Sequence, residues 1–174
     1  MTKPADRLRA NTEVDPQRLD HPSLAAVKAY WDRKRGTRTM PARADIDAVD
    51  LKDHLGWMLL LDAIGDYEDF RFRLIGTKVT RYFFVEATGK TVTEAFAPFG
   101  PGVVNGVLAV YRKTARDGIP VRAFGDAGWL GRDYYDFDAL YLPLSDDGLK
   151  ANKVLCVFTF DYRRVAARAE NALG

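Results

Sequence analysis

Hydrophobic residues recur at helical spacing in two stretches of the chain. In the first, Leu24, Val27, Tyr30 and Trp31 fall on one stripe, and the predicted helix has Ser23 as its N-cap and stops at Gly36. In the second, residues 101–117, the inward stripe is Val103, Val104, Val107, Leu108, Tyr111 and Ala115. Each pattern predicts an amphipathic helix with one face against a core.

Five other stretches have the short apolar or alternating patterns of β-strands. They cover residues 57–64, 70–75, 121–127, 134–144 and 153–162. Between the second and the third, Thr77 and Thr91 are each placed to cap a short helix, and Glu94 has the capping-box spacing from Thr91. The order predicts an α+β fold, with a five-stranded, mainly antiparallel sheet, a helical crossover on one face and an extra N-terminal helix.

Length and composition are those of a soluble globular chain with one domain. We expect residues 1–20 to be a mobile polar tail, residues 21–162 to form the domain, and residues 163–174 to be a C-terminal tail. The net charge of +2 gives no argument for DNA, and no apolar run approaches the length of a membrane helix. One cysteine and no secretory signal predict a cytoplasmic location without membrane insertion.

Three groups of motifs occur in order along the chain. Residues 30–32 (YWD) precede the basic segment 33–47 (RKRGTRTMPARADID), residues 72–77 (FRLIGT) precede 88–90 (TGK), and residues 141–148 (YLPLSDDG) lead into the last strand. Together these motifs resemble a bacterial family of small stand-alone PAS proteins. The resemblance implies a sensory or protein-interaction module in bacterial signalling, with a small ligand bound in the cleft between sheet and helices.

The tripeptide Gly89-Lys90-Thr91 has the letters that end a phosphate-binding loop. Such a loop needs a glycine five positions before the Gly-Lys pair, but this position is Phe84, and the preceding residues are helical rather than a strand. We therefore interpret Gly89 as a helix stop and Thr91 as the cap of the next helix.

No cofactor is predicted. Haem-binding relatives supply a histidine from the long helix, but residues 101–117 contain none, and the two histidines are His21 and His54. Flavin photosensors carry a cysteine in the crossover, whereas Cys156 lies in an apolar strand, where a buried, unreactive thiol is expected. These absences disfavour haem and a flavin thioadduct. Clustered metal ligands are also lacking.

A ligand site, if present, has six candidate residues. Arg73 lies in an apolar strand and could hold a carboxylate or phosphate, or it could face outward and pair with an acid of a helix. Five aromatic residues could line a cavity for a small planar or apolar ligand, or could simply be core: Trp57, Tyr82, Phe83, Tyr111 and Trp129.

No catalytic residue is predicted, so the signal would pass by protein contact. We expect Tyr30 and Trp31 to contact a second copy in a homodimer, or another signalling protein. The alternative is a small α+β cone-fold enzyme of isomerase or dehydratase type, with Asp136 or Asp138 as base and a tyrosine as donor. A third possibility is a PAS fold with a packed interior that works as a docking surface.

Overall fold

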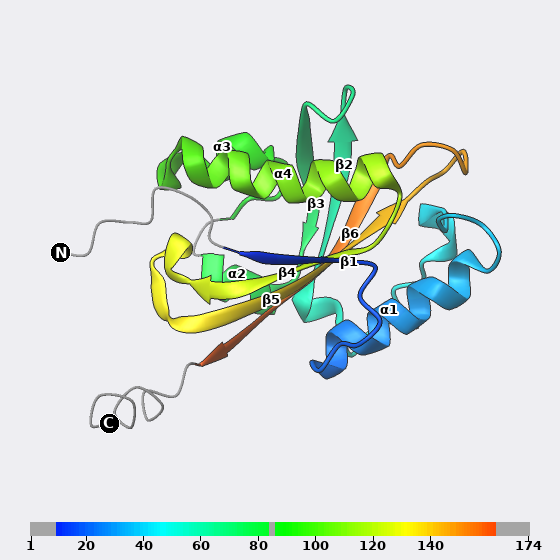
Figure 1. Ribbon diagram of the computed structural model, residues 1–174, viewed down its shortest axis with the longest axis horizontal. Coiled ribbons are helices and arrows are strands. Elements are labelled where there is room, and N and C mark those ends of the chain that lie inside the picture. The colour runs from blue at the N-terminus through cyan, green and yellow to red at the C-terminus, as the bar shows by residue number, and fades with distance from the viewer. Residues whose placement is uncertain (1–9, 84–85, 163–174) are drawn as a thin grey trace.

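The computed structural model describes residues 10–83 and 86–162 (Figure 1). The strands are β1 (Asn11–Val14), β2 (Met58–Ile64), β3 (Asp69–Ile75), β4 (Val121–Ala127), β5 (Arg132–Leu144) and β6 (Lys153–Tyr162). The α-helices are α1 (Pro22–Arg35), α2 (Thr77–Phe83), α3 (Val92–Phe96) and α4 (Pro101–Asp117). Four short 3₁₀ segments are η1 (Arg43–Asp45), η2 (Leu55–Trp57), η3 (Ala97–Phe99) and η4 (Gly128–Leu130).

The strands form one antiparallel sheet in the order β1-β4-β5-β6-β2-β3. The longest pairing joins β5 to β6, from Tyr135 opposite Tyr162 to Leu144 opposite Lys153. All five strands expected from the hydrophobic pattern are present, so the prediction of an α+β fold with an antiparallel sheet is confirmed.

The sixth strand, β1, was not predicted. Residues 11–14 were expected to belong to a mobile tail, but they pair with β4 from Asn11 opposite Phe124 to Val14 opposite Val121. All four side chains of β1 are exposed, because β1 is an edge strand held mainly by its backbone. An ion pair between Glu13 and Arg122, 3.5 Å long, adds to this pairing.

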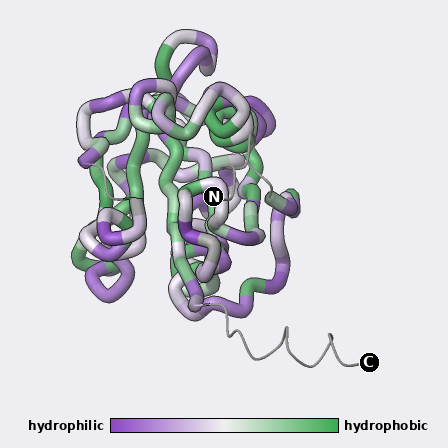
Figure 2. The backbone as a smooth tube through the Cα atoms, turned by 90° about the vertical axis from the view of Figure 1, so that its left-hand side faces the viewer, coloured by the Kyte–Doolittle hydropathy of each residue, from purple (hydrophilic) through white to green (hydrophobic). Residues whose placement is uncertain are grey.

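Helices cover both faces of the sheet, with α3 and α4 on one side and α1 on the other (Figure 1). On the first side, the ring of Tyr111 in α4 lies 5.2 Å from that of Phe70 and 5.0 Å from that of Tyr141. On the second, Trp31 of α1 donates from Nε1 to the Pro143 carbonyl at 2.9 Å. Hydrophobic positions are concentrated in the strands between these layers (Figure 2).

Helix α1 is capped two residues earlier than predicted. Its cap is His21, whose Nδ1 accepts a hydrogen bond from the Ser23 backbone N–H at 3.2 Å, and Pro22 occupies the first turn. The Ser23 hydroxyl instead lies 3.1 Å from Nδ1 of His54. The expected cap at Ser23 was therefore wrong, because a ring nitrogen of His21 serves as the acceptor in its place.

The crossover between β3 and α4 contains the Gly89-Lys90-Thr91 sequence. Gly89 has a φ of +86° in the turn before α3. The Thr91 hydroxyl accepts from the Glu94 N–H at 3.2 Å, and the Glu94 carboxylate accepts from the Thr91 N–H at 2.8 Å. This reciprocal pair is the predicted capping box, which confirms that Thr91 caps a helix.

Candidate functional site

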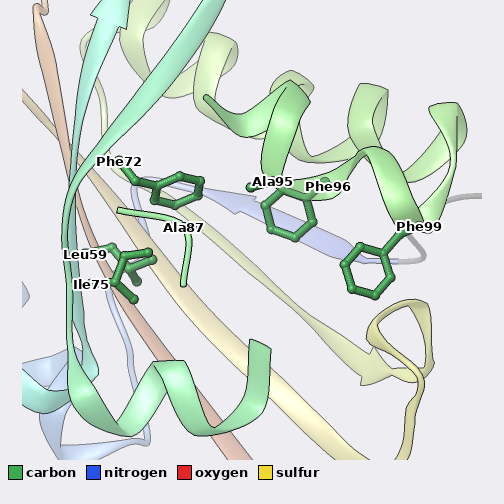
Figure 3. A pocket seen from close by; sticks show the side chains of 7 residues that line it. All are labelled: Leu59, Phe72, Ile75, Ala87, Ala95, Phe96 and Phe99. Atoms are coloured by element: carbon green, nitrogen blue, oxygen red, sulfur yellow. The ribbon is translucent and has the colours of Figure 1, made fainter. Parts of the chain in front are cut away.

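A small apolar cavity lies between the β2–β3 hairpin and α3 (Figure 3). Side chains from the strands face those of the helical segment across it, and the lining residues are Leu59, Phe72, Ile75, Ala87, Ala95, Phe96 and Phe99. Its volume is about 20 Å³. Every lining side chain is a hydrocarbon, so the cavity can accept apolar surface but offers no polar side chain to a ligand.

A second void of about 10 Å³ lies deeper, under α4. Leu59, Phe72 and Phe96 border both spaces. The remaining residues around the second void are Val107, Tyr111, Ala123, Trp129, Phe137, Tyr141 and Phe158. Among residues 10–83 and 86–162, no charged side chain lines either space. The two voids are therefore neighbours on the α4 side of the sheet, separated by the side chains that they share.

Size limits what these spaces can hold. A single water needs about 10–15 Å³, whereas pockets for drug-sized ligands span roughly 300–1,000 Å³. In this conformation the interior is close to fully packed. A ring-sized ligand would fit only after Phe72 or Phe96 moves and joins the two voids.

Two of the residues singled out from the sequence, Tyr111 and Trp129, border the deeper void. Tyr111 is 3% exposed, and burial raises the pKa of its hydroxyl well above the usual value, with the Cys156 thiol adding to the shift. Trp129 is also 3% exposed, and its indole Nε1 has no hydrogen-bond partner among the described residues. A residue that borders the deeper void therefore carries a buried donor with no partner among the described residues.

Trp57 and Tyr82 lie elsewhere, in an aromatic stack beside α2. The Trp57 ring is 6.2 Å from that of Tyr82, which stacks on Phe160 at 4.2 Å. Partial burial raises the pKa of the Tyr82 hydroxyl. Phe83 belongs to α2, but its side chain lies outside the described part of the structure. Neither Trp57 nor Tyr82 is among the residues that line the two voids, so their placement favours the alternative in which they belong to the packed aromatic core.

Arg73 points away from the cavity. Its side chain is 58% exposed and pairs with Asp62, which also accepts from Lys153 at 2.7 Å. Partial burial of Asp62 acts to raise its pKa, but the hydrogen bonds from Lys153 and Arg73 outweigh it and hold the pKa below the usual value. The geometry therefore fits the outward alternative for Arg73 rather than a ligand contact, but its acidic partner lies in strand β2 and not in a helix as expected.

Tyr30 and Trp31 are buried within the chain, at 3% and 2% exposed. The Tyr30 hydroxyl accepts from the Asp47 N–H at 2.9 Å and donates to the Asp50 carboxylate at 3.2 Å. Since both side chains are already packed against the protein's own core, they offer almost no area to a second copy. The expected partner contact through this pair does not agree with their placement.

The two carboxylates of the enzyme alternative lie on the opposite face of the sheet from the cavity. Asp138 accepts two hydrogen bonds from Arg122, at 2.8 and 2.7 Å, and Asp136 lies in the same solvent-open hollow. Neither borders the apolar cavity, where a general base would need to meet a substrate. Among residues 10–83 and 86–162, no three His, Cys, Asp or Glu side chains come together in a way that would hold a metal ion.

The wall of the cavity beside α3 was not predicted. None of its seven lining residues was among the six candidate ligand-site residues. Small residues such as Ala87 and Ala95 leave space rather than fill it, and a space has no signature in hydrophobic spacing. Only the position of the helical crossover, which covers one face of the sheet, could have indicated where the cavity lies.

A family model described as "PAS domain" matches residues 19–159, well over half of the chain. No curated protein and no solved structure matches the chain. Every helix in the described residues falls short of what a bilayer crossing requires in length or apolar character.

Proposed function

The chain belongs to the PAS domain family, and from this membership we propose that it is a sensory module that takes up a small apolar ligand between its sheet and α3. PAS domains are generally sensory or interaction modules without catalysis, which agrees with carboxylates placed on the far face of the sheet. One observation carries the proposal. Two apolar voids lie side by side on the α4 side of the sheet. The side chains of Leu59, Phe72 and Phe96, rather than backbone, separate them.

The small size of the voids suggests how a ligand would produce a signal. Because a ring-sized molecule fits only if Phe72 or Phe96 moves, occupancy would favour a different position of α3 or β3. Helix α3 packs directly on α4 and β3, and the ring of Phe96 lies 6.0 Å from that of Trp129. A shift of Phe96 would therefore change the packing of both η4 and α4.

The output partner in this proposal is a second copy or another signalling protein of a bacterial cytoplasm. Since Tyr30 and Trp31 are buried, a contact through α1 would use its outer surface, where Ala26, Ala29 and Arg33 are exposed. Substituting Ala29→Glu would then weaken self-association in sedimentation without affecting the fold. An unchanged sedimentation profile would remove α1 from the partner surface.

Native mass spectrometry of freshly purified protein tests the ligand proposal. We expect a non-covalent small-molecule adduct on the wild-type chain. The matched control is Ala95→Met, which fills the cavity with a flexible apolar side chain and should remove the adduct. Wild-type protein that has the apo mass, and whose melting temperature is unchanged by a panel of small apolar compounds, would contradict the proposal and favour a pure docking module.

A further inference from the structure

Trp129 is unusual because its indole N–H makes no hydrogen bond with the residues that the structure describes. The residue lies in η4, between β4 and β5, and is 3% exposed. The other buried tryptophan, Trp31, donates its indole N–H to the Pro143 carbonyl at 2.9 Å. Trp129 Nε1 has no acceptor among the described residues. A buried donor left unpaired destabilises a folded chain, so an exception of this kind needs a specific reason.

The surroundings of Trp129 determine what could satisfy its N–H group. Its ring lies 6.0 Å from Phe96, 5.5 Å from Phe137 and 6.5 Å from Phe158, measured between ring centroids. These rings and Trp129 line the deeper void, which no charged side chain borders. A charged ligand would lose its hydration without gaining a counter-charge, so the walls select a neutral molecule.

We propose that the joined voids bind a neutral ring compound with a single acceptor oxygen, and that Trp129 Nε1 donates a hydrogen bond to this oxygen. The inference rests on the proposed function, since it assigns the chemical class of ligand to the same cavity. The aromatic and aliphatic walls bury the ring, and the indole N–H fixes its orientation. Aryl ketones have this combination of shape and polarity.

A matched pair of probes separates the hydrogen bond from simple apolar burial. Acetophenone and α-methylstyrene have nearly the same shape, but a carbonyl oxygen in the first replaces a CH₂ group in the second. We expect acetophenone to bind the wild-type protein about tenfold more tightly, the effect of one hydrogen bond to an otherwise unpaired buried donor. In Trp129→Phe, the two probes should bind equally. Trp57→Phe, which alters a tryptophan away from both voids, should keep the tenfold ratio.

A second readout uses the unmodified chain, so that it does not depend on the folding of a variant. In protein labelled with ¹⁵N at the indole nitrogens, acetophenone should move the Trp129 proton resonance downfield, as expected for a new hydrogen bond. The same concentration of α-methylstyrene should not. The Trp31 resonance should stay in place with both probes, because its N–H is already bonded.

The outcomes distinguish this inference from the proposed function. Equal binding of both probes to wild-type protein, or a tenfold ratio that persists in Trp129→Phe, would overturn the role of Trp129 but leave an apolar ligand site standing. An indole proton in contact with a long-lived buried water would also overturn it. Failure of both probes to bind would overturn the inference together with the proposal on which it rests.

Discussion

Gly76, at the junction between β3 and α2, should be among the least replaceable residues of the crossover. A Cβ atom at this position would lie 2.3 Å from the Gly56 carbonyl oxygen and 2.4 Å from that of Leu55. Both atoms belong to the backbone of η2, so no side-chain rotation can relieve the contact. The sequence analysis placed a helix cap directly after Gly76, but the structure shows that the requirement comes from a close approach of two backbone segments.

The size of the effect of Gly76→Ala follows from these distances. Normal contact requires η2 and the junction to separate by roughly 1 Å, and such overpacking typically costs about 1–3 kcal/mol. The same movement would stretch the bond from the Gly76 N–H to the Met58 carbonyl, now 2.7 Å, beyond hydrogen-bonding range, at a cost of about 1 kcal/mol. Reduced entropy of the unfolded chain returns about 0.4–1 kcal/mol. We expect a net loss of about 1–4 kcal/mol.

Urea unfolding followed by tryptophan fluorescence and circular dichroism measures this loss. The control is Gly56→Ala on the other side of the same junction, where the nearest atoms are Cγ and Cδ of the Lys78 side chain at 3.0 and 3.1 Å. Since that side chain can move, the control should lose less than about 1 kcal/mol. The reasoning would be refuted if Gly76→Ala were no less stable than Gly56→Ala.

Three further predictions concern other parts of the chain. Trp31→Phe leaves the buried Pro143 carbonyl without its donor and should lower the free energy of unfolding by about 1–3 kcal/mol; an unchanged urea midpoint would contradict this. Asp147 accepts from the backbone N–H groups of Lys150 and Leu149, which lower its pKa to about 2. Because the pKa is depressed, the stabilisation is present above about pH 4 and is lost as pH falls toward 2. The free energy of unfolding of Asp147→Asn should therefore depend less on pH over that range, and equal pH dependence of the two proteins would contradict this. Burial raises the pKa of the Cys156 thiol, so a thiol reagent at pH 8 should react only at the rate of unfolding; rapid modification of the native protein would show that the strand is open to solvent.

Much of the fold follows from the sequence because its strongest signals are local and periodic. The alternation over residues 70–75 and the stripe over residues 101–117 are each set by one buried face, and both became the expected elements. Strand β1 shows the limit of this reasoning. Its four side chains are exposed and only Val14 is apolar, so backbone pairing with the distant β4 makes it a strand, and no nearby residue carries that information.

The site was less predictable because it depends on which elements the side chains pack against in the folded chain. Tyr30 and Trp31 were correctly placed on the buried stripe of α1, but periodicity does not say whether a stripe meets its own sheet or another protein. Arg73 illustrates the same problem, because the strand pattern allows its side chain to lie on either face of the sheet. The ion pair with Asp62 of the neighbouring strand determines the face. Trp129 was identified as an aromatic residue, whereas the significance of its unpaired N–H depends on the absence of acceptors around it in three dimensions.

Uptake of an apolar molecule between the sheet and α3 is best tested by methyl NMR. In protein labelled with ¹³C at the alanine methyl groups, Ala87 and Ala95 report from the cavity wall, and the exposed Ala26 and Ala29 of α1 report from the far side. Titration with α-methylstyrene should move the Ala87 and Ala95 signals to a saturating position while those of α1 stay unchanged. Cavity methyl signals that do not move, or that move no more than those of α1, would contradict the account.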